Sequence, residues 1–169
     1  MPAPFVLSSP DLERHDDCTR DNKATCSTIP VKNTLETIGG QNQSLELDWG
    51  PGPAGTMSYA IGLHDLSNGP NGYTHWVVWN IPATALKLAA NLPRTVMLDM
   101  PQGAEQASFS NDNCYAGPGA HGNVYEFKVY ALKVASIDVA NVDDQAAIRQ
   151  QLEKSTDVLG TSALRGKSP

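Results

Sequence analysis

The chain has 169 residues, a length that fits a single domain with a sizeable core. It carries 12 lysines and arginines against 18 aspartates and glutamates, and this net charge of −6 excludes the basic surface that nucleic-acid binding needs. No apolar run of about 18 residues is present, so the sequence predicts no transmembrane segment. Its 14 glycines and 12 prolines indicate many turns, and therefore strands or long loops.

Four segments in the first half of the chain have the pattern of strands. Residues 3–9 are a short apolar run that ends at a proline. Residues 45–49 (LELDW) alternate apolar and acidic side chains, and a turn at 50–55 separates them from a second alternating run at 57–65. Residues 75–82 (HWVVWNIP) are apolar on both faces, which indicates a strand in the interior of a sheet.

The second half begins with a long polar segment. Residues 103–123 are rich in glycine, asparagine and serine, and this composition predicts a long loop. Residues 124–134 (VYEFKVYALKV) again alternate and predict a long strand.

One segment, residues 142–154, has the pattern of a helix. Asn141 or Asp143 can cap its first turn, and Ile148 and Leu152 form an apolar pair one helical turn apart. The residues from 155 onward contain two glycines and a basic tail, and we expect this end to fray. Since no repeat or interior linker is present, residues 1–169 are predicted to form one β-rich domain with a peripheral helix.

Two cysteines, Cys18 and Cys26, bracket a polar stretch within residues 11–28, which we interpret as a loop insertion. A disulfide there would imply an oxidising compartment, and two free thiols on a cytosolic loop are the alternative. The polarity of the loop favours the disulfide, because free cysteines would have no core to join. A zinc site is disfavoured, since the two cysteines are too far apart in sequence and His15 is the only histidine nearby.

The cellular location follows from these cysteines. A bridged pair predicts a periplasmic or secreted protein, and an unbridged pair leaves the cytoplasm as the alternative. The first ten residues lack a charged region and an apolar region, so no signal peptide is visible.

A group of polar residues lies where the predicted strands end. Asp65 closes one strand and His75 opens the next, so a hairpin-like connection would place a carboxylate beside an imidazole and favour the protonated histidine. Together with glycine-loop N–H groups, His121 and Tyr125, this arrangement predicts an anion site. The alternative is that His75 is a structural histidine under Trp76.

Catalytic signatures are mostly absent. The sequence has no G-x-S-x-G, Walker A, G-x-G-x-x-G or H-E-x-x-H motif. The one candidate nucleophile, Cys114 beside Tyr115, is interpreted as a buried thiol. A metal site at His64, Asp65 and His75 is disfavoured, because adjacent residues of a strand point to opposite faces. We therefore expect no enzyme, no metal site and no cofactor.

Six segments resemble, in the same order, the phosphatidylethanolamine-binding protein family in its bacterial Raf-kinase-inhibitor-like branch. One of these matches would be weak, but six in order are specific. They are FVLSSPDL near the start, IP at 29–30 with GGQNQSLELDW at 39–49, SYAIGLHD at 58–65, HWVVWNIP at 75–82, NDNCYAGPG at 111–119, and VYEFKVYAL at 124–132.

The resemblance implies a mainly β fold, an antiparallel β-sandwich with a few peripheral helices. It also implies a non-catalytic, inhibitory binding protein. The implied ligands are phosphate-like anions, including the phosphorylethanolamine headgroup, and a protein such as a kinase is a further implied partner. The residues that match the family's site are Asp65, His75, Tyr115, Gly117, Pro118 and Tyr125.

The site also departs from the family pattern. Leu66 and Ser67 stand where the family has a proline and a second acid, and Asn123 stands where it has a histidine. Asparagine can donate a hydrogen bond but carries no charge. His121 could take the missing role if positions 121, 123 and 125 share one face of a strand that reaches back that far. The altered pocket leaves a second interpretation, a protein-interaction module with a vestigial pocket.

Overall fold

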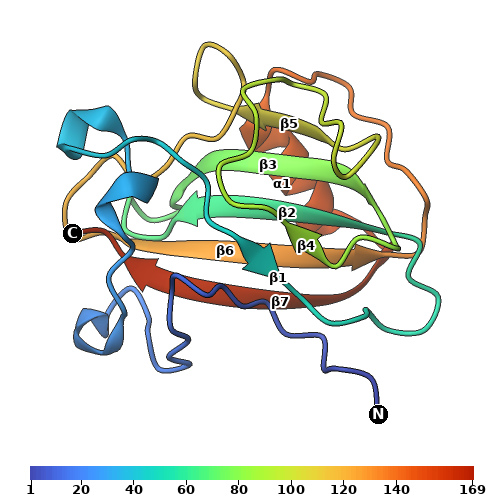
Figure 1. Cartoon of the computed structure of the whole chain (residues 1–169), viewed down its shortest axis with the longest axis horizontal. Helices are drawn as coiled ribbons and strands as arrows, with labels where there is room; N and C mark the ends of the chain where they lie inside the picture. Colours follow the sequence, from blue (N-terminus) through green and yellow to red (C-terminus); the bar gives the residue numbers. More distant parts are fainter.

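A five-stranded antiparallel sheet forms the centre of the molecule (Figure 1). The computed structural model describes residues 1–169, and the strand order in this sheet is β5-β3-β2-β6-β7. The strands are β2 (Ser58–Asp65), β3 (Tyr73–Pro82), β5 (Glu105–Ser108), β6 (Val124–Leu132) and β7 (Val158–Lys167).

A second, two-stranded antiparallel sheet of β1 (Leu47–Asp48) and β4 (Lys87–Leu88) lies over one face of the large sheet (Figure 1). Three short 3₁₀ helices precede it in the chain, at Lys23–Thr25, Val31–Asn33 and Glu36–Ile38. The prediction of a mainly β fold with two antiparallel sheets is confirmed.

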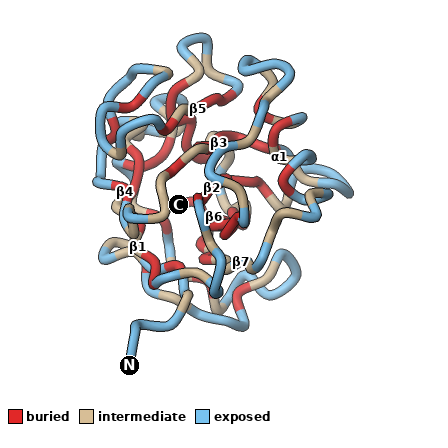
Figure 2. Tube along the Cα trace, turned by 90° about the vertical axis from the view of Figure 1, so that its right-hand side faces the viewer, coloured by how far each residue is buried: buried red, intermediate tan, exposed pale blue.

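Both faces of the large sheet are covered by apolar side chains. The larger core cluster joins sheet residues such as Trp76 and Phe127 to Leu47 and Leu88 of the small sheet. A smaller cluster packs the opposite face against the helix α1 (Gln145–Lys154). This double cover explains why all eight residues of β2 are buried, and Figure 2 shows the buried segments gathered in the sheet beneath exposed loops.

The helix begins later than the sequence pattern indicates. Asp144, rather than Asn141 or Asp143, is the N-cap, and its side chain accepts a hydrogen bond from the Ala147 N–H at 2.9 Å. The predicted apolar pair is confirmed, because Ile148 and Leu152 are both buried in the smaller core cluster.

Two other predicted elements are corrected. Residues 3–9 form no strand, because only Ser8 and Ser9 make isolated bridges while the segment lies against the core through Leu7. The expected loop at 103–123 contains β5, which pairs with β3 in spite of its polar sequence. Its Gln106 is fully buried because its side-chain oxygen accepts the Trp76 indole N–H at 2.9 Å.

The expectation that the C-terminal residues fray is wrong. Residues 158–167 form β7, which pairs with β6 along its length. The glycine that suggested flexibility, Gly166, is required by close packing, since a Cβ atom there would lie 2.9 Å from side-chain atoms of Ile29 and Leu12.

The two cysteines of the polar loop form a disulfide in this structure, with 4.6 Å between the Cα atoms of Cys18 and Cys26. The bridge packs against Val124 at the start of β6, with Leu66 at its margin. Cys114 is a free, buried thiol, and burial raises its pKa. No helix here has the length and apolar character needed to cross a bilayer.

Candidate functional site

Asp65 and His75 lie at the same end of the β2–β3 hairpin, as the sequence predicts. Asp65 is the last residue of β2 and pairs with Tyr73, two residues before His75. The two side chains make no hydrogen bond to each other. The Asp65 carboxylate instead accepts the backbone N–H of Ser67 and the side-chain amide of Asn123, each at 2.9 Å.

The His75 imidazole is held by one nitrogen. Its Nδ1 lies 2.9 Å from the carbonyl oxygen of Gly117 and 3.2 Å from that of Ala116, so Nδ1 carries a proton and donates it. The other nitrogen, Nε2, has no hydrogen-bond partner and is not completely buried, so it keeps some contact with solvent. His75 is therefore fixed in orientation with one ring atom left available.

Burial lowers the pKa of His75, and the two carbonyl contacts and the charge of Asp65 offset this only in part. The sequence predicts the opposite shift, because it places the carboxylate directly beside the ring. The carboxylate is instead bonded elsewhere, and the ring is only 5% exposed, so desolvation dominates and the neutral imidazole is favoured.

Three aromatic rings surround His75. The ring centroids of Tyr73, Phe109 and Tyr125 lie 5.7, 4.9 and 5.2 Å from its own, each edge to face. Tyr125 is fully buried, and the other two are 40% and 38% exposed, so they form a half-open aromatic rim. The sequence analysis missed Tyr73 and Phe109, although a lone aromatic side chain in a polar loop was a usable signal for Phe109.

Tyr115 supports the site from behind. It is buried in the main core, where its ring packs edge-on against Trp76 at 5.1 Å. Its hydroxyl donates to the carbonyl oxygen of Asn33 at 2.8 Å, and burial raises its pKa. Tyr115 therefore fixes the loop that carries Ala116 and Gly117, and it does not face the site.

Gly117 and Pro118 form the wall of the site through their backbone. The Gly117 N–H donates to the side-chain oxygen of Asn42 at 2.9 Å, and the Pro118 carbonyl accepts the Leu35 N–H at 2.9 Å. A Cβ atom on Gly117 would lie 2.2 Å from the Asn33 carbonyl oxygen, so glycine is required there. The wall is thus held at a fixed distance from His75.

The sequence-based alignment of His121 with the site is wrong. Strand β6 starts at Val124, and Gly122 has a φ of 71°, so positions 121 and 123 do not alternate as in a strand. His121 is exposed and its Nδ1 lies 2.7 Å from the carbonyl oxygen of Pro169 at the C-terminal end. Asn123, by contrast, reaches Asp65, as described above.

Tyr125 closes the inner side of the site. Its hydroxyl accepts the backbone N–H of Gly119 at 3.3 Å, and burial with the nearby charge of Asp65 raises its pKa. The phenol is therefore a neutral hydrogen-bonding group. It cannot serve as a base near neutral pH.

The polar residues of the site lie together beneath the half-open aromatic rim. Asp65, His75, Asn123 and Tyr125 come together, and none of them lines the hollows of about 260–510 Å³ found elsewhere on the surface. The Asn123 amide bonds Asp65, Nδ1 of His75 bonds two carbonyl oxygens, and the Tyr125 hydroxyl accepts the Gly119 N–H, so Nε2 of His75 is left free for a ligand. No group of three histidine, cysteine or acidic side chains is arranged to hold a metal ion.

The other histidine of this hairpin is not part of the site. His64 points to the opposite face of β2, where its Nδ1 lies 3.1 Å from the Thr74 hydroxyl and its Nε2 lies 3.1 Å from the Asn71 carbonyl oxygen. Both ring nitrogens are therefore occupied, in contrast to those of His75.

Comparison with known proteins gives a consistent picture. The model of the family described as phosphatidylethanolamine-binding protein matches residues 21–167. The chain is 38% identical over 101 residues to the UPF0098 protein YbcL of Escherichia coli (strain K12), an alignment that covers 54% of each protein. A UPF0098 protein of Methanothermobacter thermautotrophicus is 33% identical over 106 residues, or 61% of this chain and 67% of that protein. The chain thus matches about half the length of the first of these relatives.

Solved structures extend the similarity over the whole chain. The crystal structure of Escherichia coli YbcL, described as a new member of the mammalian PEBP family, has a TM-score of 0.72 at 26% identity and covers 98% of both chains. The structure of CT736 from Chlamydia trachomatis, described as a homologue of the same family, has a TM-score of 0.71 at 18% identity, covering 98% of this chain and 97% of that one. The second comparison supports the fold alone.

Proposed function

Because the chain belongs to the phosphatidylethanolamine-binding protein family, we propose that it is a non-catalytic binding protein whose site around His75 takes a phosphate-like anion. The observation that carries this proposal is the free Nε2 of His75, held in place through Nδ1 and reached from a half-open aromatic rim. The ligand class includes inorganic phosphate and the phosphorylethanolamine headgroup.

The chemistry of binding follows from the state of this ring. With Nδ1 donating to two carbonyl oxygens, Nε2 of the neutral ring is an acceptor and has no hydrogen to donate to a fully ionised anion. When Nε2 takes up a proton, the ring becomes a cation and can donate a charge-assisted hydrogen bond. Anion binding at His75 is therefore expected to bring a proton with it.

A second candidate function is a protein-interaction module with a vestigial pocket. The supporting observation is that Asp65 is already bonded by Ser67 and Asn123, while His75 lines none of the hollows of about 260–510 Å³ on the surface. In this alternative the outer surface of the protein binds a partner protein.

Two further proposals concern context. We propose that binding modulates a partner protein, and a kinase is the class that the family resemblance implies. We also propose a periplasmic or secreted location, with the cytoplasm as the alternative, because a disulfide such as Cys18–Cys26 persists in oxidising compartments. Mass spectrometry of thiol-blocked protein taken directly from its native source tests the second point, since a reduced pair would contradict it.

The test of the site is a thermal-shift titration with inorganic phosphate and with O-phosphorylethanolamine, on the native protein, His75→Ala and His64→Ala. A ligand that binds only the folded state adds about 2.7 kcal/mol of stability at a hundredfold excess over its Kd. His64 is a matched control, because it is also buried in the same hairpin but has no free nitrogen.

The proposal expects a ligand-dependent rise in Tm that survives in His64→Ala and is lost in His75→Ala. A rise that survives in His75→Ala would place the anion elsewhere. No rise at millimolar ligand with any of the three proteins would favour the vestigial pocket.

A further inference from the structure

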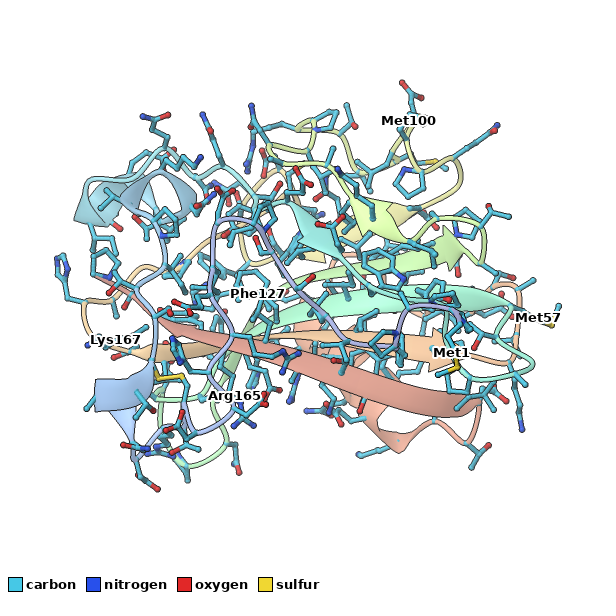
Figure 3. The ribbon with its side chains drawn as sticks, turned by 60° about the horizontal axis from the view of Figure 1, so that its bottom comes forward. Met1, Met57, Met100, Phe127, Arg165 and Lys167 are labelled. Atoms are coloured by element: carbon cyan, nitrogen blue, oxygen red, sulfur yellow. A yellow bond between two sulfur atoms is a disulfide. The ribbon has the colours of Figure 1, made fainter.

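The outer edge of the large sheet has unpaired backbone groups over part of β7, beside residues 14–18 of the same chain. Odd-numbered residues of β6 hydrogen-bond to β7, so the backbone groups of Thr161, Ala163 and Arg165 point away from the sheet. None of these three residues has a backbone hydrogen-bond partner on the outer side. Figure 3 shows β7 as the outermost strand, crossing the front of the view with Arg165 and Lys167 toward one end.

The same edge already accepts an extended segment of this chain. At Lys167, the next outward-facing residue, the backbone N–H donates to the Ser27 carbonyl and the carbonyl accepts the Ile29 N–H, each at 2.8 Å. The bridge between Thr28 and Lys167 is parallel. The edge is therefore competent for strand addition, and the chain's own segment covers only its last part.

A hollow of about 260 Å³ lies beside the uncovered part of the edge. Two of the residues that line it have N–H donors with no hydrogen-bond acceptor. The Nε atom of Arg14 is buried without a partner, and Nη2 of Arg165 makes no hydrogen bond. The hollow is lined by Arg14, His15, Asp16, Cys18, Ala163 and Arg165.

The two arginines lie on opposite faces of the sheet edge. Arg14 contacts the hydroxyl of Ser162 at 3.4 Å, on the face where Leu164 enters the main core. Arg165 bonds Glu126 at 2.8 Å, and neighbouring residues of a strand point to opposite faces. Consecutive side chains of an added strand would therefore meet Arg14 on one face and Arg165 on the other.

The existing acidic partners of these arginines leave room for a ligand. The carboxylate of Asp16, which pairs with Arg14 at 2.9 Å, is 82% exposed, and ion pairs of this kind in water are weak. Glu126 occupies Nε of Arg165 but not Nη2. The donors that remain are matched by carboxylates.

We propose that the edge of β7 from Thr161 to Arg165 binds an extended peptide segment of a partner protein that carries two adjacent acidic side chains. The backbone of the segment pairs with the outward groups of Thr161, Ala163 and Arg165, and its two carboxylates reach Arg14 and Arg165. This surface is distinct from the site around His75, so the two proposals stand or fall separately.

The probe is a seven-residue peptide of alternating threonine and valine with two adjacent glutamates at its centre. The matched control is the same peptide with glutamines, so that the protein is unchanged. Hydrogen exchange followed by NMR should slow by at least about tenfold at the amides of Thr161, Ala163 and Arg165. The amides of Ser162 and Leu164 already bond β6 and should change little, which makes them internal controls.

Three variants test the contacts. Ala163→Pro removes one outward N–H at a place where an edge strand tolerates proline, and it should abolish binding of the probe. Arg14→Gln should weaken binding by roughly fivefold, the upper range for one exposed ion pair, and Arg14→Lys should restore part of it. Arg149→Gln, on the far helix, is the control and should have no effect.

Several outcomes would overturn the proposal. Equal affinity for the glutamate and glutamine peptides would show that the arginines do not bind the acidic side chains. If hydrogen exchange at millimolar probe slows at other amides, or at none, the edge of β7 is not the binding site. Protection of the same three amides without peptide at high protein concentration, together with a dimer in analytical ultracentrifugation, would assign the edge to a second copy of this chain.

Discussion

His75 combines two features that rarely occur together at a buried ring. Its Nδ1 is saturated by the carbonyl oxygens of Ala116 and Gly117, and its Nε2 has no partner. Because burial lowers its pKa, the free protein holds this ring neutral at neutral pH. Any anion that binds there must therefore raise that pKa.

This linkage predicts that anion affinity at His75 increases as the pH falls. The increase begins near the pKa of the complex and levels off below the lower pKa of the free protein, with a slope of at most about tenfold per pH unit for one proton. Titration calorimetry with sulfate, which does not itself titrate between about pH 5 and about pH 8, measures the slope and the proton uptake. A Kd that is independent of pH, or that tightens at high pH, would contradict the linkage.

The Asp65 carboxylate is held by a hydrogen bond from Asn123, as the His75 ring is held by the carbonyl oxygens of Ala116 and Gly117. Asp65 is 2% exposed, and the Asn123 amide and the Ser67 N–H both donate to its carboxylate. A buried carboxylate with a donor removed loses more free energy than an exposed one, because no water takes the place of the amide.

We expect Asn123→Ala to reduce the free energy of unfolding by about 1–3 kcal/mol, measured by urea denaturation. Asn71→Ala is the control, because Asn71 is exposed and its side chain makes no hydrogen bond. In an Asp65→Asn background the cost of Asn123→Ala should shrink, since the neutral amide needs its donor less. Equal costs in both backgrounds would show that Asn123 acts on something other than the carboxylate.

Among the elements, the disulfide loop and β7 support the site from outside. The bridge between Cys18 and Cys26 packs on Val124, the first residue of β6, with Leu66 directly after Asp65 at the margin of this cluster. The C-terminal Ser168 accepts the Asn123 N–H at 3.1 Å and so continues β7 into the site. The disulfide loop and β7, both distant in sequence from Asp65, therefore help to hold Asp65 and Asn123 in place.

Replacing both cysteines, Cys18→Ser with Cys26→Ser, should lower the free energy of unfolding by about 2–3 kcal/mol, the chain-entropy value for a loop of this length. The measurement is urea denaturation, with the native protein in reducing buffer as a second route to the same state. Cys114→Ser is the control, because it keeps the Cys18–Cys26 bridge, so reductant should destabilise it by as much as it destabilises the native protein. A loss under about 0.5 kcal/mol would show that the loop is ordered without the bridge.

At the scale of the whole molecule, two buried histidines lie back to back across β2 and β3. Burial is the largest cause of the lowered pKa of both His64 and His75. In each case the unfolded chain binds a proton more readily than the folded one. Stability from this source is complete above the unfolded pKa of about 6.5 and declines as the pH falls through the lower, folded values.

The protein should therefore begin to lose stability just below about pH 6.5, well before its carboxylates titrate, by up to about 1.4 kcal/mol per pH unit for each histidine. Urea denaturation between about pH 5 and about pH 8 measures the slope. In a His64→Gln, His75→Gln double variant the slope over this window should flatten. An unchanged slope would assign it to other groups.

Several features could be predicted from the sequence because their causes are local. Period-two alternation located the strands at 57–65 and 124–134, and a run that is apolar on both faces located the strand at 75–82, since both patterns can be read locally along the chain. The polarity of residues 11–28 favoured a bridge between Cys18 and Cys26, and the structure contains it.

Other features were decided only by tertiary structure. The C-terminal residues, expected to fray, became β7 because β6 offered a full partner edge, and β5 formed from a polar segment because β3 and the indole of Trp76 satisfied it. The sequence also placed Asp65 beside His75 but could not show that Asn123 binds the carboxylate, which leaves His75 to desolvation and reverses its pKa shift. Alternation and polarity are local properties of the sequence, whereas hydrogen-bond partners and burial depend on which distant segments come into contact.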